Sequence, residues 1–309
     1  MLKVLFAAKS EAWAEYQAPL NKAFRDAGLG VDLSCDHPCA DVDYIVLAPN
    51  GPVSDFTPYV NAKAVLNLWA GVESIAGNRT LTHPLARMVD DGLTRGMVEW
   101  VTGHVLRHHL GIDAHILGQD GQWRTDYPPL AADRPVTILG LGALGTACAR
   151  ALVALGFPVT GWSRTPKNVE GVKCLHGDQG LDEALAAAQI AVLLLPDTPA
   201  TQNLLNADRL AMLAQGAFVV NPGRGPLIDD DALLAALDSG QLAHATLDVF
   251  RVEPLPQDHA FWAHPQVTVT PHIASTTRPE TASQIIAENI ARGENGLPFL
   301  HLVDRSAGY

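Results

Sequence analysis

Cysteine is scarce in this chain, with four residues in 309, and so is positive charge. Four cysteines in a chain of this length do not make a disulfide scaffold. Lysine and arginine together number 21 against 33 aspartates and glutamates, which gives a formal net charge of -12 at pH 7. A surface this acidic repels phosphate backbones, so we expect no nucleic-acid partner.

Long apolar runs are also missing. No stretch approaches the ~20 residues that a membrane helix needs, so we expect no membrane partner. The opening MLKVLFAAKS has neither the length nor the small-residue cleavage site of a secretory signal. Together with the few cysteines, these features favour a reducing cytoplasm as the location of the protein.

One cluster of soft side chains resembles a metal site. Cys35, His37 and Cys39 lie close together in the segment CDHPC. A closed zinc site needs a fourth ligand, and no candidate lies nearby in the sequence. We therefore expect no bound metal.

The first hundred residues alternate between strand and helix patterns, and the length suits two domains. Apolar runs at 2–8, 42–49 and 62–70 predict buried strands, and apolar positions at helical spacing predict a helix over 11–27. Continuous apolar runs separated by helices indicate a parallel sheet covered on both faces.

A long helix is predicted over 94–110, where His108 and His109 would place positive charge at the negative end of the helix dipole. Residues 118–135 resemble a loop.

A second β-α series begins at Pro135. Strands are predicted at 135–140, 157–163, 189–196, 216–222, 244–250 and 267–271, with helices between most of them and a last helix from 278 to 293. This repetition predicts an α/β fold of two doubly wound parallel-sheet (Rossmann-like) domains with a cleft between them. We expect a dinucleotide-binding domain at 98–276 and a discontinuous substrate domain at 1–97 and 277–309.

The turn after the strand at 135–140 has the spacing G-x-G-x-x-G, formed by Gly140, Gly142 and Gly145. Gly140 permits a tight turn, Gly142 lets the backbone approach a pyrophosphate, and Gly145 lets the helix pack close to the strand. The free N–H groups that open the helix suit phosphate oxygens. The alternative is a glycine-rich turn in an unrelated protein, but the strand-turn-helix context favours a cofactor loop that includes Ala143 and Leu144.

The end of the next strand indicates which cofactor is used. An NAD-selective domain usually has Asp or Glu there, about 20 residues beyond the loop. This strand ends instead in Trp162-Ser163-Arg164-Thr165. Arg164 can pair with a 2′-phosphate, with Ser163 and Thr165 as further donors, although a solvated surface arginine is the alternative. The pattern favours NADPH, with NADH as a weaker cofactor.

Three polar segments follow later strands, at the sheet edge where open α/β sheets bind ligands. They are NPGRG with Arg224, DVFRVEPLP with Glu253, and TPHIAS with His272. Singly, each residue has an ordinary structural explanation: a strand-end arginine, a turn cap and a core histidine. In this order, together with the glycine loop, they resemble the D-isomer-specific 2-hydroxyacid dehydrogenase family. The resemblance covers nearly the whole chain.

Three further segments narrow the resemblance within that family. LWAGVESI, MVEW and the WSR after the second strand are most similar to the glyoxylate/hydroxypyruvate reductases of the A type. The resemblance implies an oxidoreductase that reduces small 2-keto acids, such as glyoxylate and hydroxypyruvate, to D-2-hydroxy acids. Its chemistry transfers a hydride from the nicotinamide to the carbonyl carbon of the keto acid.

The residue types suit that chemistry. His272 can donate the proton that the carbonyl oxygen needs, because imidazole changes charge between about pH 5 and 8. Glu253 would hydrogen-bond the other ring nitrogen and fix the tautomer. Arg224 would bind the substrate carboxylate and polarise the carbonyl.

The resemblance implies further contacts. In the family, backbone N–H groups of a first-domain loop bind the carboxylate, which corresponds here to Ala70, Gly71 and Val72. Trp69 just before them would either form a wall of the pocket or be buried at the strand end. Further cofactor contacts are implied for Leu195, Pro196 and Asp248. A homodimer is also implied, with the long helix and the loop around 110–130 reaching across to the partner.

Two other functions remain open. The chain could act on another D-2-hydroxy acid, such as lactate, or it could be a nicotinamide-binding corepressor-like protein that recruits partners. A phosphorylated substrate would need extra cations near 48–52 or 70–80. The first window has none and the second has only Arg79.

Overall fold

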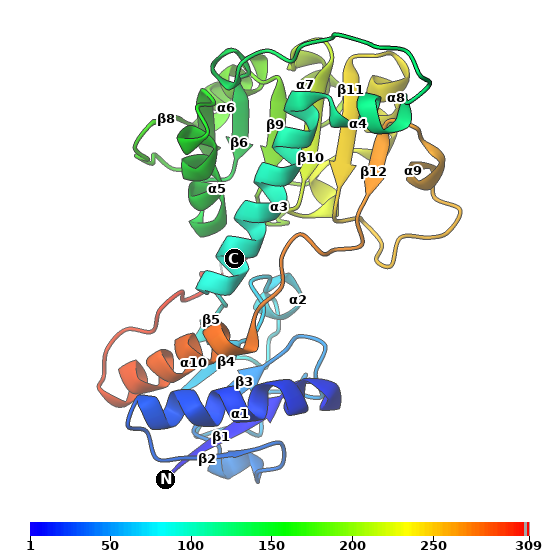
Figure 1. Ribbon diagram of the computed structural model, residues 1–309. Helices are drawn as coiled ribbons and strands as arrows, with labels where there is room; N and C mark the ends of the chain where they lie inside the picture. Colours follow the sequence, from blue (N-terminus) through cyan, green and yellow to red (C-terminus); the bar gives the residue numbers. More distant parts are fainter. Residues whose placement is uncertain (306–307, 309) are drawn as a thin grey trace. The chain divides into compact units, whose positions relative to one another are not determined.

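The computed structural model describes residues 1–305 and 308, and the chain divides into two compact units. The first unit consists of Met1–Leu93 and Thr276–Tyr309, and the second of Thr94–Ser275. Each unit is built on its own parallel β-sheet with helices packed against it (Figure 1), which confirms the predicted α/β fold class. None of the described helices is long and apolar enough to span a membrane.

The sheet of the first unit has five parallel strands in the order β2-β1-β3-β4-β5. Their bounds are β1 (Leu2–Ala7), β2 (Val31–Ser34), β3 (Tyr44–Leu47), β4 (Ala64–Asn67) and β5 (Leu85–Ala86). The three central strands are the apolar runs that the sequence predicts.

Side chains alternate between the two faces of this sheet, as a pleated strand requires. Val4 and Phe6 face the core beneath α1 (Ser10–Asp26) and α10 (Pro279–Glu294), two helices that lie side by side (Figure 1). Leu5 packs on the opposite face, in a core that includes Ile75 of the short helix α2 (Glu73–Ala76). The first unit therefore joins the N-terminal segment and the returning C-terminal helix in one core.

The sheet of the second unit has seven parallel strands in the order β12-β11-β10-β9-β6-β7-β8. Their bounds are β6 (Val136–Leu139), β7 (Val159–Ser163), β8 (Val172–His176), β9 (Ile190–Leu193), β10 (Ala217–Asn221), β11 (Leu242–Leu247) and β12 (Val267–Val269). The order reverses at β6, which has β7 on one side and β9 on the other. Such a reversal is the usual ligand-binding point of an open α/β sheet.

Helices cover both faces of the second sheet (Figure 1). One core contains side chains of α3 (Asp91–Leu110) and α5 (Ala143–Ala154), and the other contains side chains of α6 (Gly177–Ala186), α7 (Ala207–Met212) and α8 (Asp230–Asp238). The remaining elements are short: α4 (Ile112–Leu117), α9 (Ala260–Ala263), η1 (Cys39–Asp41), η2 (Ala131–Asp133) and η3 (Gly225–Leu227). The two-sided cover explains why the strands are continuous apolar runs.

Three strands are absent from the sequence prediction: β2, β5 and β8. Both β2 and β8 are edge strands in which no residue is fully buried, and β5 is only two residues long. An edge strand that is half in solvent does not need a continuous apolar run, so its pattern is weak.

Candidate active site

The loop after β6 has a shape that depends on glycine. Gly140 has a φ of 110°, and its N–H donates to the carbonyl oxygen of Trp162 at 2.8 Å. A Cβ at Gly145 would lie 1.8 Å from the carbonyl oxygen of Gly140. Helix α5 therefore begins in direct contact with the strand before it, and only glycine fits at position 145.

Gly142 differs from these two, because it faces open space. It is the N-cap of α5, and a Cβ built on it would meet no atom within 4 Å. The N–H groups of Ala143 and Leu144 follow in the first helical turn, where no acceptor exists within the helix. Outward donors at the positive end of a helix dipole, at the reversal of strand order, suit a pyrophosphate. The loop therefore fits the dinucleotide that the spacing predicts.

The end of β7 lies next to this loop. Ser163 is buried, and its hydroxyl donates to the carbonyl oxygen of Thr165 at 2.8 Å, so it shapes the turn. Arg164 and Thr165 are exposed. Ser163 pairs with His176 of β8, which adds an exposed histidine to this edge. His176 is not among the residues predicted from the sequence, because β8 is not among the predicted strands.

The predicted contacts after β9 lie on the other side of the glycine loop. Leu195 is nearly buried, and its side chain lies 3.2 Å from the position of a Cβ on Gly140. The carbonyl oxygen of Pro196 accepts a hydrogen bond from the Thr201 hydroxyl at 2.7 Å. The three predicted cofactor segments therefore follow three neighbouring strands, β7, β6 and β9.

Arg224 lies in a tight turn directly after β10. The buried side chain of Asn221 spans this turn: its Oδ1 accepts from the N–H of Gly223 at 3.1 Å, and its Nδ2 donates to the carbonyl oxygen of Arg224 at 2.9 Å. A Cβ at Gly225 would lie 2.0 Å from the carbonyl carbon of Phe250. The turn is therefore packed directly against the segment that carries Glu253, and Arg224 itself is half-buried.

The structure joins His272 and Glu253 directly. Nδ1 of His272 lies 2.7 Å from Oε2 of Glu253, and the other carboxylate oxygen accepts from the N–H of Phe250 at 2.9 Å. The carboxylate therefore binds Nδ1 and leaves Nε2 as the ring nitrogen available to a ligand. The histidine side chain is 52% exposed, so a ligand can reach it.

The backbone of His272 has a φ of 53°, which is uncommon for a residue with a side chain. Asp248 supports this turn and has no exposed surface. Its carboxylate accepts from the Thr270 hydroxyl at 2.6 Å and from the N–H groups of Ile273 and Ala274 at 2.9 Å each. The structure thus gives Asp248 a supporting position beneath His272, whereas its predicted cofactor contact stays a prediction.

The predicted carboxylate loop lies in the first unit, after β4. Ala70 and Gly71 are half-buried and Val72 is buried. Trp69 is 43% exposed, so of its two predicted placements the buried one is wrong. The contact of residues 70–72 with a substrate stays a prediction.

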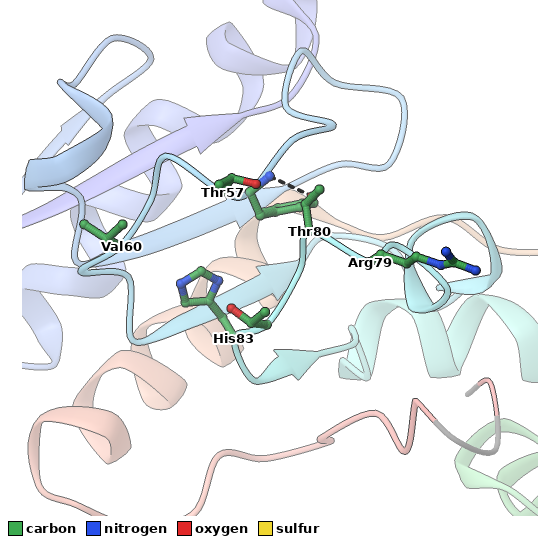
Figure 2. A pocket seen from close by; sticks show the side chains of 7 residues that line it. Thr57, Val60, Arg79, Thr80 and His83 are labelled. Atoms are coloured by element: carbon green, nitrogen blue, oxygen red, sulfur yellow. Dashed lines mark hydrogen bonds between the residues drawn. The ribbon is translucent and has the colours of Figure 1, made fainter.

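The first unit also has a surface hollow of about 450 Å³, lined by residues of 56–60 and 79–83. Figure 2 shows that Arg79 points away from the imidazole of His83, while the N–H of Phe56 donates to the hydroxyl of Thr80 at 3.0 Å. Arg79, the one cation in the 70–80 window, therefore does not point towards His83 of this hollow. Among residues 1–305 and 308, no three His, Cys, Asp or Glu side chains gather as metal ligands would.

The chain is similar to known proteins along most of its length. Residues 102–274 match the family described as D-isomer specific 2-hydroxyacid dehydrogenase, NAD binding domain. Glyoxylate/hydroxypyruvate reductase A of Serratia proteamaculans is 42% identical over 255 residues, which cover 80% of this chain and 82% of that protein. The reductase of the same name from Yersinia enterocolitica is 40% identical over 81% of this chain and 82% of its own.

Solved structures extend the similarity to the fold. A D-isomer specific 2-hydroxyacid dehydrogenase from Xanthobacter autotrophicus Py2, in complex with NADPH and MES, is 41% identical with a TM-score of 0.93, over 100% of this chain and 99% of that chain. The NADPH-dependent glyoxylate/hydroxypyruvate reductase of Sinorhizobium meliloti, in complex with NADP and sulfate, is 36% identical with a TM-score of 0.88, over the full length of both chains.

Proposed function

The chain belongs to the D-isomer specific 2-hydroxyacid dehydrogenase family, and we propose that it reduces glyoxylate and hydroxypyruvate to the hydroxy acids with NADPH. It is an NAD(P)-dependent oxidoreductase. The observation that carries the proposal is the 2.7 Å contact between Nδ1 of His272 and the carboxylate of Glu253, which leaves Nε2 available to a substrate. The named relatives and NADP-bound neighbours support this choice of substrate and cofactor.

The residues of this site have separate tasks in the proposed reaction. When bound, NADPH supplies the hydride that adds to the carbonyl carbon. Nε2 of His272 donates the proton to the carbonyl oxygen, and Glu253 holds the ring and compensates its positive charge. Arg224 binds the carboxylate with two parallel N–H donors and favours the charge that grows on the carbonyl oxygen. The keto acid gains one hydride and one proton and becomes the hydroxy acid.

The preference for NADPH rests on the end of β7. Residues 163–168 include Arg164 and Lys167 and contain no carboxylate that would repel a 2′-phosphate. The guanidinium of Arg164 can make charge-assisted hydrogen bonds to that phosphate, and Thr165 adds a hydroxyl. The role of Ser163 is indirect, since its hydroxyl is used within the turn.

A homodimer in the cytoplasm completes the proposal. The segment 110–130 exposes several large apolar side chains, which is unusual for a surface that stays in water. They are Leu110, Ile116, Leu117, Trp123, Tyr127 and Leu130, with exposed fractions from 41% to 95%. A second copy of the chain that packs on this segment would cover them, and light scattering would then give twice the mass of 32.9 kDa.

A panel of keto acids tests the proposed function. NADPH oxidation is followed at 340 nm with glyoxylate, hydroxypyruvate, pyruvate and phenylpyruvate, and chiral chromatography identifies the hydroxy acid formed from the three larger substrates. We expect the highest kcat/KM for glyoxylate and hydroxypyruvate, and D products. A preference for pyruvate would indicate a lactate-type enzyme. Tight NADPH binding without turnover of any keto acid would favour a corepressor-like role.

A further inference from the structure

Asn67 is the last residue of β4, and its side chain is almost fully buried, with 1% exposed. The Nδ2 group donates to the carbonyl oxygen of Trp69 at 2.7 Å and to that of Gly71 at 3.0 Å. The carbonyl of Trp69 also accepts from the N–H of Met88 at 3.0 Å. Both carbonyls of the turn after β4 are therefore directed inward.

This arrangement decides where the N–H groups of the turn point. In a trans peptide the C=O and the N–H of one unit point in opposite directions. The carbonyl of Trp69 shares its peptide with the N–H of Ala70, and the carbonyl of Gly71 shares its peptide with the N–H of Val72. Both N–H groups therefore point away from Asn67.

Within residues 1–305 and 308, no acceptor takes the N–H groups of Ala70, Gly71 or Val72. Buried backbone donors are nearly always paired in folded proteins, with another protein group or with water. Backbone N–H groups of a turn can together bind an anion. The turn thus presents backbone donors that are available to a carboxylate.

We propose that Asn67 is a positioning residue that aims the N–H groups of the 70–72 turn at the carboxylate of the keto acid. The inference rests on the proposed function, because a keto acid supplies the anion. Asn67 itself touches no substrate, and its effect passes through the two peptide units that it holds.

The chemistry of the side chain favours this role over a purely structural one. Oδ1 of Asn67 is buried without a hydrogen-bond partner, which is unfavourable for folding. An apolar side chain of similar size would avoid that cost but could not donate. Aspartate would replace the two donors with a charge that faces two carbonyl oxygens. Asparagine is the residue of this size that supplies two N–H donors from one atom.

Neighbouring contacts hold the segments on both sides of the turn. The hydroxyl of Thr277 donates to the carbonyl oxygen of Leu68 at 2.9 Å. The guanidinium of Arg305 donates to the carbonyl oxygens of Ala76 and Leu81, and also to that of Asn78 at 2.6 Å. The loss of Asn67 should therefore affect the turn at 69–72 more than the segments around it.

Two substitutions test the proposal, Asn67→Leu and Asn67→Asp. In both we expect the KM for the keto acid and the inhibition constant of oxalate to rise about ten- to a hundred-fold, since charge-assisted hydrogen bonds to the carboxylate are lost. The KM for NADPH should stay within about twofold. Asn67→Asp should be worse than Asn67→Leu, because its charge also repels the substrate.

A matched control is Asn289→Leu, which changes another buried asparagine of the first unit. Asn289 is 2% exposed, and its Oδ1 accepts from the N–H of Leu300 at 2.7 Å, in the tail rather than in the turn. The Asn289→Leu substitution should lower Tm, while the KM for the keto acid and the inhibition constant of oxalate stay unchanged. Folded Asn67 variants with unchanged constants would overturn the proposal, and so would an equal rise in Asn289→Leu.

Hydrogen exchange on the unmodified chain covers the case in which the variants do not fold. Oxalate added with NADP⁺ should slow amide exchange at Ala70 and Val72, and unchanged exchange there would overturn the proposal. This readout needs no turnover. If the wild-type chain reduces neither glyoxylate nor hydroxypyruvate, the proposed function fails, while oxalate protection still tests whether the N–H groups of the 70–72 turn bind a carboxylate.

Discussion

Removal of the Asp248 carboxylate should damage both stability and turnover. In Asp248→Ala, the Thr270 hydroxyl and the N–H groups of Ile273 and Ala274 lose their acceptor. Each hydrogen bond to a charged group contributes about 1.5–3 kcal/mol. Two of the three donors are only partly buried, so water can replace part of the loss. We expect the free energy of unfolding to fall by about 3–5 kcal/mol.

The same bonds hold the uncommon backbone conformation of His272, whose φ is 53°. Without them the turn can relax, and the imidazole leaves its place beside Glu253. General acid catalysis typically contributes 10²–10⁴-fold, so kcat should fall by about 10² or more. The KM for NADPH should change little if Asp248 acts through this turn, and it should rise if the carboxylate contacts the cofactor directly.

Thermal unfolding and steady-state kinetics measure both effects. For a unit of this size, about 3–5 kcal/mol corresponds to a Tm lower by about 6–20 °C. Asp238→Asn is the control, because Asp238 is a carboxylate of the same unit with a 76% exposed side chain that lies 3.2 Å from His264. An Asp248→Ala variant whose kcat stays within threefold of wild type and whose Tm changes by less than about 2 °C would refute this reasoning.

Three further predictions concern cofactor choice, substrate binding and pH. Arg164→Ala should raise the KM for NADPH about tenfold and leave that for NADH unchanged, since only the former carries the 2′-phosphate; equal weakening of both cofactors would contradict it. Arg224→Lys should lose nearly as much keto-acid turnover as Arg224→Ala, because lysine lacks the planar two-donor fork. If the lysine variant keeps most of the turnover, Arg224 acts only through its positive charge. Burial lowers the pKa of His108 to about 3 and that of His244 to about 4, against about 6.5 in an unfolded chain. Below about pH 6.5 these two histidines therefore bind protons in the unfolded chain while they stay neutral in the folded chain. The free energy of unfolding should fall as pH drops from about 6.5 towards 4, by up to about 1.4 kcal/mol per pH unit for each histidine. Urea unfolding should show a shallower slope in His108→Gln, and a flat profile in the wild type would contradict the reasoning.

The buried histidines show one limit of the sequence interpretation. The end of the long helix suggests that His108 and His109 carry positive charge near the helix dipole. That interpretation is wrong for His108, which is buried against Thr246, with Nε2 2.9 Å from its hydroxyl, and neutral at pH 7. Its partners Phe218 and Thr246 come from β10 and β11, more than a hundred residues away, so the local sequence pattern cannot indicate them.

The site shows where local patterns suffice and where they do not. The glycine spacing predicts the loop after β6 because each glycine meets a steric requirement within the loop itself, such as the contact of Gly145 with the backbone of Gly140. The strand end at Arg224 is predictable because β10 before it is an apolar run that is mostly buried. His272 instead follows β12, a three-residue edge strand that is only half-buried. The supporting roles of Asn67 and Asp248 are not predictable, because they depend on which carbonyls and N–H groups the folded backbone turns towards them.

His272→Ala tests the central claim most directly, since the account assigns the proton donor to that imidazole. We predict that kcat for glyoxylate reduction falls by 10²–10⁴-fold, while NADPH binding measured by nicotinamide fluorescence stays nearly the same. A His272→Ala variant that retains more than about a tenth of the wild-type kcat would remove His272 from the mechanism and contradict the account.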